Sequence, residues 1–577
     1  MIAKLLKVVL CLMHTPVINK KQGEVTMKKL HLKLLLAVAL SVCTMSTLLT
    51  GCGSQDTVSG SSEVSKDVAE SSATGEISVE STVEEDPVKM PEEVSIWGWI
   101  GGSATNAGAK DANDVKGFQL IEEMTGTHIN WEISSGGTQE ELFNLLIAGG
   151  NYPDLITYYW SGQECETFAE DEVIVELTDL IPEYMPNFWA FLEANPDKKK
   201  VLQNDDGKIF YIPYIREDIE LCIYLGPVMR KDWLEKLGLD VPNTPDELYT
   251  VLKEFKEQDP NGNGKQDEIP MSGQKFAHGH SGIGYLLNAF NTHWTFYLKD
   301  GEVVYGPMTD EYVEGIEYIA KLYSEGLIDI DYLQNDRTMM DGKFMNNEVG
   351  FVYGFQPTKY YNNMHESGAY VEGIGHFKSA DGIRHTYNST YTESVMSTSV
   401  ALTTACENVE GTLMWLDTFF SEEGTEAMNF GEEGVDFNYV DGVPVFTEES
   451  TAVDPNTNVS KFGLVSAQQD SYFPCLQQWE AYSQSLSPWG AQAIAKWGEE
   501  VDISLILPAL SFTQEENAAI TDTENAITTY VDECVNKVII GKMTVAEWTD
   551  VQKKITEMGL EQVLEVYNAA YQRYLNK

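Results

Sequence analysis

The chain has 577 residues and carries 90 acidic against 38 basic side chains, which gives a formal net charge of −52 at pH 7. This charge excludes a nucleic-acid-binding protein that works through a basic surface, because each phosphate contact needs a cation. Hydrophobic residues make up 43% and aromatic residues 11% of the chain, which excludes a wholly disordered chain and provides apolar surface for about two to four domains.

The first 51 residues are predicted to be a signal peptide of the lipoprotein type. From Met27 a cationic start is followed by a short apolar run and then by Leu-Thr-Gly-Cys, ending at Cys52. The apolar run, residues 34–49, is shorter than the about 20 residues of a membrane-spanning helix. We expect cleavage before Cys52 and a lipid anchor there, on the extracellular face of a Gram-positive type of cell membrane. The purine-rich codons expected for residues 22–25 favour Met27 as the true start.

Residues 52–93 are predicted to be the lipidated cysteine and a disordered tether. The segment after Cys52 consists largely of Ser, Thr, Glu, Asp and Gly and has no aromatic residue, so it cannot bury enough apolar surface to fold. Removal of the leader, which holds seven Lys and one Glu, changes the net charge from −52 to −58.

From residue 94 onward, short strands alternate with helices, which predicts an α/β fold with mainly parallel sheets. Thr244 and Pro245 supply an N-cap and a first helical residue, and Gly238 and Gly559 end helices. Strands are predicted at 94–99, 128–134, 153–159 and 349–353. Helices are predicted at 118–124, 139–147, 230–238 and 410–420, from Thr244 onward, and on both sides of Gly559.

Five phrases of the chain form an ordered series. They are IAGGNYPDLI, RKDWLEKLGLDVPNTPDELYTVLKEFKEQDPNGNGKQDEIP, LYSEGLID, FGEEGVDFNYVDG and GLEQVLEVYNAAYQRYL. Together they resemble the extracellular solute-binding proteins of ABC importers, in particular the long lipoprotein branch that takes up oligosaccharides in Gram-positive bacteria. The resemblance covers nearly all of the chain after the tether. It implies a two-lobed periplasmic-binding-protein-like fold of type II, with a ligand cleft between lobes that close by hinge motion.

The resemblance also implies lobe boundaries and a function. We expect an N-terminal lobe of residues 94–214 plus 369–430 and a C-terminal lobe of residues 215–366 plus 431–577. The protein would be a lipid-anchored receptor, not an enzyme, that captures an oligosaccharide and delivers it to the ABC permease subunits in the membrane. We expect a monomer without a nucleic-acid partner.

Residues 259–270 contain the front half of an EF-hand calcium loop. Oxygen-bearing residues stand at positions 1, 3 and 5, Gly264 permits the sharp turn at position 6, and a backbone carbonyl follows at position 7. Position 12 is Pro270 and not Glu, but in alginate-binding members of the superfamily, which this loop resembles, an acidic pair at positions 9 and 10 completes the cage. The alternative is a solvated Asn-Gly turn without metal. We expect a structural Ca²⁺ ion held by Asp259, Asn261, Asn263, Lys265, Asp267 and Glu268.

An oligosaccharide site needs aromatic platforms for C–H faces and polar groups for hydroxyls. In parallel-sheet lobes such groups gather in loops that follow strands. Arg216, one of only five arginines, is a polar candidate for the ligand-binding site. The scarcity of arginine argues against a polyuronate ligand. Core packing is the alternative for each aromatic candidate, and helical spacing places Trp233, Trp415 and Trp548 in the core. The remaining candidates are Trp97, Trp99, Tyr158, Tyr159, Trp160, Trp294, Phe355, Gln356, Trp479 and Trp489.

Other classes of protein stay open at this point. A secreted glycoside hydrolase needs a carboxylate pair about 5 to 10 Å apart, which so acidic a chain always offers, but no GxSxG, P-loop or HExxH motif supports catalysis. A peptide or other small-solute receptor would share the fold, and a surface adhesin would bind without an importer. His278 and His280 lack the further ligands of a zinc site. The 8 cysteines form no CxxC pair, which predicts mostly buried single thiols.

Overall fold

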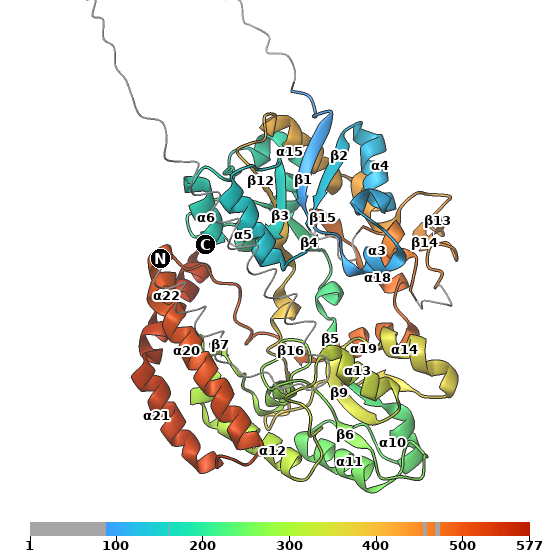
Figure 1. Cartoon of the computed structure of the whole chain (residues 1–577), viewed down its shortest axis with the longest axis vertical. Helices are drawn as coiled ribbons and strands as arrows, with labels where there is room; N and C mark the ends of the chain where they lie inside the picture. The colour runs from blue at the N-terminus through green and yellow to red at the C-terminus, as the bar shows by residue number, and fades with distance from the viewer. Residues whose placement is uncertain (1–87, 135, 161, 454–458, 468–472) are drawn as a thin grey trace, which may run out of the picture. The chain divides into compact units, whose positions relative to one another are not determined.

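A computed structural model describes residues 88–577 except 135, 161, 454–458 and 468–472 (Figure 1). The predicted signal peptide, the lipidation site Cys52 and the tether as far as residue 87 lie outside the described residues. The last residues of the predicted tether belong to the fold. The carbonyl of Lys89 accepts a hydrogen bond from Asn408 Nδ2 at 2.9 Å, and that of Pro91 accepts one from Thr127 Oγ1 at 2.7 Å.

The first sheet has the strand order β15-β4-β12-β3-β1-β2. Strand β1 runs parallel to β2 and β3, whereas β12 runs antiparallel to β3 and β4. Five of its six strands therefore run in the same direction, as predicted for a mainly parallel sheet, and β12 returns from the other lobe in the opposite direction. The strands are β1 (Glu93–Gly98), β2 (His128–Ile133), β3 (Leu155–Tyr159), β4 (Ile212–Arg216), β12 (Val395–Leu402) and β15 (Cys475–Gln477).

Helices and one hairpin surround this first sheet and form the first lobe. Thr138 caps α5 through a capping box with Glu141, and Gly126 ends α4 in the left-handed conformation that glycine favours. The elements are α3 (Gly102–Ala107), α4 (Lys116–Thr125), α5 (Gln139–Gly149), α6 (Gly162–Glu170), α7 (Ile181–Tyr184), α8 (Pro186–Ala194), α9 (Pro196–Leu202), α15 (Val409–Asp417), α16 (Glu422–Phe430), α17 (Phe462–Val465) and the hairpin β13 (Phe437–Val440) with β14 (Val443–Phe446).

The second sheet has the order β10-β5-β9-β6 and forms the second lobe. Strand β9 is parallel to β6 but antiparallel to β5, so this sheet is mixed. Its strands are β5 (Leu225–Arg230), β6 (Ile269–Met271), β9 (Val349–Phe355) and β10 (Val371–Gly373). Two smaller strand pairs accompany it, β7 (Phe296–Lys299) with β8 (Glu302–Tyr305) and β11 (Arg384–His385) with β16 (Val501–Asp502).

The helices of the second lobe include the three last helices of the chain, which lie side by side in red in Figure 1. Thr244 caps α11 with Pro245 at its first position, and Gly238 and Gly559 end α10 and α21, as predicted. The helices are α10 (Lys231–Leu237), α11 (Pro245–Glu257), α12 (Asp310–Ser324), α13 (Arg337–Met345), α14 (Thr358–Met364), α19 (Pro488–Gly498), α20 (Gln514–Ile539), α21 (Trp548–Met558) and α22 (Leu560–Asn576).

Each sheet has its own buried core. Phe118, Leu155 and Val400 belong to the first core, and Trp233 and Trp548 to the second. Trp233, Trp415 and Trp548 are at most 1% exposed, as the sequence predicts. The cysteines of the described part are buried and form no disulfide with one another, namely Cys165, Cys222, Cys406, Cys475 and Cys534.

Two expected lobe boundaries differ from the structure. Strand β10 was expected in the first lobe but pairs with β5 in the second sheet. Strand β15 was expected in the second lobe but pairs with β4 in the first sheet, where Phe473 and Cys475 join the first core. Strand pairing between distant segments decides both assignments. The chain passes between the lobes along three segments, which we call the crossing segments: residues 217–224, 389–394 and 478–487, the last containing α18 (Trp479–Gln484).

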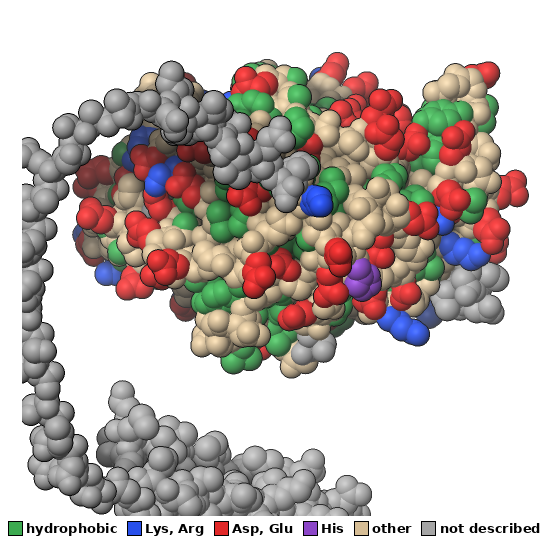
Figure 2. All heavy atoms as spheres, turned by 90° about the horizontal axis from the view of Figure 1, so that it is seen from above, with side chains coloured by type: hydrophobic (Ala, Val, Ile, Leu, Met, Phe, Trp, Pro, Cys, Tyr) green, Lys and Arg blue, Asp and Glu red, His purple; other side chains and the backbone are tan. Residues whose placement is uncertain are grey.

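The surface of the described part is strongly acidic. Figure 2 shows one face on which Asp and Glu side chains are spread widely and are interrupted by few Lys or Arg. Within the described ranges, we find no helix with the length and apolar composition that a membrane crossing requires.

Candidate ligand-binding site

A cavity of about 480 Å³ lies beside two of the crossing segments, and we call it the main cavity. This volume is within the range of small-molecule sites, about 300 to 1,000 Å³. Tyr224 reaches it from the first crossing segment, and Ser389, Thr390 and Glu393 from the second. The other lining residues belong to the second lobe and are Gly279, His280, Tyr285, His293, Trp294, Thr295, Phe296, Tyr387, Asn388, Ile506, Leu507 and Tyr567.

Aromatic rings form one wall of the main cavity. The Tyr285 ring stacks on Tyr353 at 4.1 Å and meets Trp294 edge-on at 4.8 Å, so Trp294 is held in a fixed orientation. Its indole also lies 3.9 Å from the His293 ring. Because Trp294 remains half-buried, part of its ring stays accessible. A fixed, accessible indole is the platform that the C–H face of a sugar requires.

Three polar side-chain atoms of the main cavity are buried without a hydrogen-bond partner in the described part of the chain. These atoms are His293 Nδ1, Asn388 Nδ2 and Thr390 Oγ1. His293, Asn388 and Thr390 are 7%, 3% and 6% exposed, respectively. Each such buried group costs about 1 to 3 kcal/mol if it stays unsatisfied. Burial also lowers the pKa of His293 to about 3, so its imidazole is neutral near pH 7. The cavity is therefore suited to a neutral ligand with many hydroxyl groups.

A stack of cations and rings extends from the main cavity to the first lobe. The Arg216 guanidinium lies 5.1 Å from the Tyr224 ring, and Tyr224 stacks with Phe355 at 5.8 Å. The Arg337 guanidinium lies 4.0 Å from the centre of Phe355, and His280 lies 5.2 Å from the same ring. Arg216 ends strand β4 of the first sheet and Phe355 ends β9 of the second. The stack thus joins the carboxyl ends of strands from both lobes.

A second cavity of about 590 Å³ lies between the lobes. Ser103 and Asn106 reach it from the first lobe, and Gln356 and Tyr361 from the second. The third crossing segment adds Gln484 and its neighbours. Hydroxyl and amide side chains dominate its lining, so this cavity is also polar.

Three of the predicted site residues lie at the main cavity or beside it. Trp294 lines it, and Arg216 and Phe355 belong to the adjoining stack. Gln356 lines the second cavity. Trp479 is half-buried on the third crossing segment, where its backbone N–H donates to Asp218 Oδ2 at 3.1 Å.

The structure places four other predicted residues in the cores. Trp160 is 1% exposed and donates from Nε1 to the Ile156 carbonyl at 3.1 Å. Tyr158 stacks on Phe143 at 3.7 Å. Trp97 is 7% exposed and Trp489 is 8% exposed. Trp97 and Tyr158 lie on strands and Trp489 lies on a helix, and not in loops, so their side chains pack within their own lobes.

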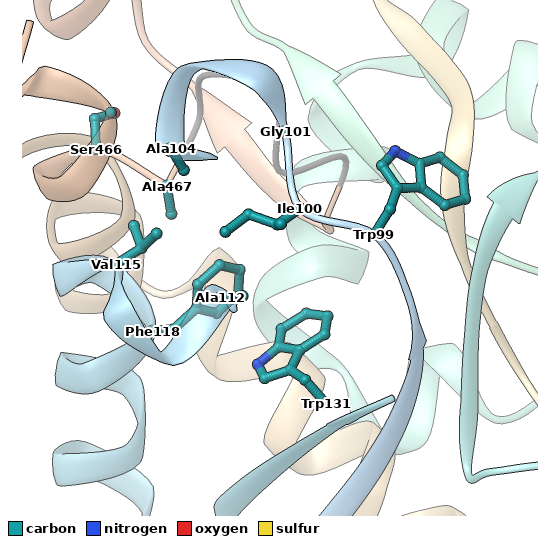
Figure 3. A pocket seen from close by; sticks show the side chains of 11 residues that line it. Trp99, Ile100, Gly101, Ala104, Ala112, Val115, Phe118, Trp131, Ser466 and Ala467 are labelled. Atoms are coloured by element: carbon teal, nitrogen blue, oxygen red, sulfur yellow. The ribbon is translucent and has the colours of Figure 1, made fainter. Parts of the chain in front are cut away.

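Trp99 lines a small cavity within the first lobe (Figure 3). In Figure 3 its indole points away from Ile100 and Phe118. The cavity holds about 10 Å³, room for roughly one water molecule and not for a sugar ring. Tyr159, whose ring lies 5.8 Å from that of Trp99, is 46% exposed.

Sequence reasoning missed Tyr224, His280, Asn388 and Glu393 at the main cavity. Tyr224 and Glu393 lie on crossing segments, which no local pattern identified. The polar-aromatic run from Tyr387 to Glu393 was the available signal, since its composition matches that of the predicted sugar-binding loops.

The predicted calcium loop has the turn that such a loop requires. Asp259 accepts hydrogen bonds from the backbone N–H groups of Gly262 and Gly264 at 2.8 and 3.0 Å, and both glycines have positive φ, 75° and 77°. Asn261 and Asn263 donate to Asp267 Oδ1 at 3.4 and 2.8 Å. The polar groups of the loop therefore converge.

Glu268, at the end of the loop, has two buried carboxylate oxygens without a hydrogen-bond partner of ordinary geometry. Burial raises the pKa of Glu268, and the backbone N–H groups of Glu268 and Asn261 offset only part of this effect. Among the described residues, no group of three or more His, Cys, Asp and Glu is placed to hold a metal ion. The orphaned Glu268 carboxylate is therefore the observation in this loop that fits a cation.

The family model for bacterial extracellular solute-binding proteins matches residues 101–426, more than half of the chain, so the chain belongs to this family. The chain is also 27% identical over 495 residues to the fructooligosaccharide ABC transporter substrate-binding protein FusA of Streptococcus pneumoniae serotype 4, which covers 81% of this chain and 88% of FusA.

Two solved structures share the fold. A FusA EF-hand mutant of S. pneumoniae in complex with fructo-nystose has a TM-score of 0.67 at 25% identity and covers 84% of this chain and 100% of that chain. The alginate-binding protein AlgQ2 without calcium ion has a TM-score of 0.65 at 23% identity and covers 83% of this chain and 98% of that chain. The predicted two-lobed fold and the predicted family are therefore confirmed.

Proposed function

We propose that this chain is the receptor of an ABC transporter that binds an oligosaccharide in the main cavity and delivers it to the permease subunits. The observation that carries the proposal is the set of three buried polar atoms, on His293, Asn388 and Thr390, around one cavity with an aromatic wall. Sugar hydroxyls satisfy such groups, and the accessible part of Trp294 takes a C–H face. The name of FusA, a fructooligosaccharide-binding relative, supports the same class of ligand.

The position of the main cavity explains how binding could be coupled to closure. Tyr224, Thr390 and Glu393 lie on crossing segments, so a ligand that touches them touches the hinge. Arg216 of the first lobe donates to the Glu393 carbonyl at 3.4 Å. A ligand that satisfies polar groups only when these segments approach would favour the closed state.

The receptor would act as a monomer at the extracellular face of the membrane, held by a lipid on Cys52. This part of the proposal rests on the leader sequence ending at Cys52 and on the family to which the chain belongs. No catalytic role is proposed, because the main cavity offers complementarity to a ligand and the relatives of the chain are named as binding proteins.

A structural Ca²⁺ ion would be held by Asp259, Asn261, Asn263, the Lys265 carbonyl, Asp267 and Glu268. The buried Glu268 carboxylate supports this assignment, as do the names of two relatives that mention calcium or an EF-hand. The ion would fix the connection between α11 and β6. Because β6 pairs with β9, which ends at Phe355, the ion would stabilise the second lobe beneath the main cavity.

Titration calorimetry of the mature protein against neutral fructo-oligosaccharides, uronate oligosaccharides and peptides tests the proposed function. We expect binding of one class of oligosaccharide at micromolar or tighter affinity, and loss of binding in Asn388→Ala. Binding of peptides alone would establish the peptide-receptor alternative. Release of shortened sugars during the titration would show that the protein is an enzyme.

A further inference from the structure

The hairpin of β13 and β14 exposes an apolar face. Phe437 and Phe446 are opposite each other in the register, are 0% and 8% exposed, and pack into the first lobe. The opposite face carries Val440, Val443 and Val445, which are 54%, 50% and 39% exposed. Alternation along a strand normally places polar side chains on the face that meets water.

The exposed valines belong to a well-formed element. Val440 pairs with Val443 across a two-residue turn of Asp441 and Gly442, both with positive φ, 53° and 83°. Such turns match the twist of a hairpin and hold its strands in register. The valine face is thus a preformed apolar surface, and exposed surfaces of this kind mark sites of interaction.

Exposed acidic residues lie in the turn of the hairpin and on both sides of it along the chain. Among the described residues, these acidic side chains form one ion pair, between Lys461 Nζ and Glu449 Oε1 at 3.5 Å. An anionic lipid surface and a second copy of this chain would both be repelled by this rim. An apolar protein surface bordered by Lys and Arg is complementary to it. The exposed acidic residues of this rim are Glu433 before β13, Asp441 in the turn, and Glu448 and Glu449 after β14.

The hairpin is connected to the cleft through Gln484. Its Oε1 accepts from the Phe446 N–H at 3.0 Å, and its Nε2 donates to the Pro444 carbonyl at 2.9 Å. Gln484 ends α18 on the third crossing segment and lines the second cavity between the lobes. A partner seated on the hairpin therefore lies beside the cleft and one side chain away from a crossing segment.

We propose that the valine face of β13 and β14 is a docking surface for the permease, and that it binds an apolar permease surface bordered by basic residues. The inference rests on the proposed function for the existence of the permease, and on the valine face and its acidic rim for the location. Docking here places the permease next to the cleft from which the ligand must be released.

The test uses the full chain and its own permease in nanodiscs, with affinity measured by biolayer interferometry with and without fructo-nystose. The double variant V440T/V443T keeps β-branched side chains, so the hairpin is retained. We expect its affinity for the permease to fall about tenfold, with an unchanged melting temperature and unchanged sugar affinity. I330T is the matched control, because Ile330 is 78% exposed on the second lobe. It should bind the permease normally.

Each alternative occupant gives a different result. Affinity for the permease within about twofold of the unsubstituted chain, at equal receptor concentration, would overturn the docking surface. A dimer that dissociates in V440T/V443T by analytical ultracentrifugation would assign the face to a second copy, and loss of binding to permease-free lipid vesicles would assign it to lipid. Failure of the unsubstituted chain to bind any oligosaccharide would overturn the proposed function instead. Permease affinity measured without sugar tests the docking surface independently of sugar binding, so failure of one proposal can be distinguished from failure of the other.

Discussion

Arg573 of the last helix joins the two lobes through Asp205. Its Nε lies 2.5 Å from Asp205 Oδ2, and its Nη2 lies 2.6 Å from Glu516 Oε2 on α20. Lys577 adds a contact to Asp205 Oδ1 at 3.1 Å. The C-terminal end of the second lobe is therefore tied to the loop after α9 in the first lobe by two cations that share one carboxylate.

Breaking this connection should weaken the coupling between the lobes. We expect a double-mutant cycle of Arg573→Gln and Asp205→Asn to give a coupling free energy of unfolding of about 0.5 to 1.5 kcal/mol, because both side chains are only partly buried. The coupling should decrease in 0.5 M NaCl, which screens partly exposed charges. Urea denaturation measures it. A coupling indistinguishable from zero at low salt would show that the pair contributes nothing to stability.

Removal of the Trp294 ring should weaken sugar binding. We expect Trp294→Ala to lower affinity by about 2 kcal/mol, roughly 30-fold, because the main cavity loses its accessible platform. Calorimetry measures the change. Trp189→Ala is the control, since Trp189 is also half-buried but packs in the first lobe with Lys199 4.0 Å from its ring. Equal losses in both variants would assign the effect to global destabilisation.

Calcium should stabilise the protein through Glu268. We expect removal of Ca²⁺ by EGTA to lower the melting temperature by several degrees, since a ligand at 100 times its Kd adds about 2.7 kcal/mol. Glu268→Gln should remove most of this response, and Asp300→Asn, at a turn outside the loop, should keep it. An unchanged melting temperature on chelation would contradict the site.

The calcium response should also depend on pH. The pKa of Glu268 is raised by burial, so without metal the fold favours the protonated carboxyl, and this contribution is lost as pH rises through the raised pKa. Calcium requires the ionised carboxylate. The stabilisation by calcium should therefore grow with increasing pH across that range, as differential scanning calorimetry at several pH values would measure. A response independent of pH would exclude Glu268 as a ligand.

Asp381 should contribute a small acid-dependent stability. A hydrogen bond from Ser379, and others from the Ile383 N–H and His385, lower the pKa of Asp381 to about 2. A carboxyl group whose pKa is lower in the folded than in the unfolded chain stabilises the fold at pH values above its unfolded pKa. This contribution is lost as pH falls through the folded-state pKa of about 2. Because Asp381 is 41% exposed, we expect less than about 1 kcal/mol. The difference in unfolding free energy between the unsubstituted chain and Asp381→Asn should shrink from pH 5 towards pH 2.5 in urea denaturation, and a constant difference would contradict it.

The sequence by itself determined the local elements and the family. Thr244, Pro245, Gly238 and Gly559 mark helix ends because capping and positive φ depend on one or two neighbouring residues. The five phrases identified the family because each is a short stretch of sequence, and their residues and their order along the chain resemble those of the family. The composition of the loop at residues 259–268 indicated a cation site for the same reason.

The tertiary structure alone decided which residues meet. Trp160 and Trp294 both stand in polar-aromatic loops, yet Trp160 is 1% exposed and Trp294 lines the main cavity. Trp160 is enclosed by Phe143 of α5 and Phe168 of α6, and this packing is not visible in the composition of the loop. The same holds for β10 and β15, whose sheets are set by pairing with β5 and β4. Burial and strand pairing are contacts between distant segments, and no local pattern carries them.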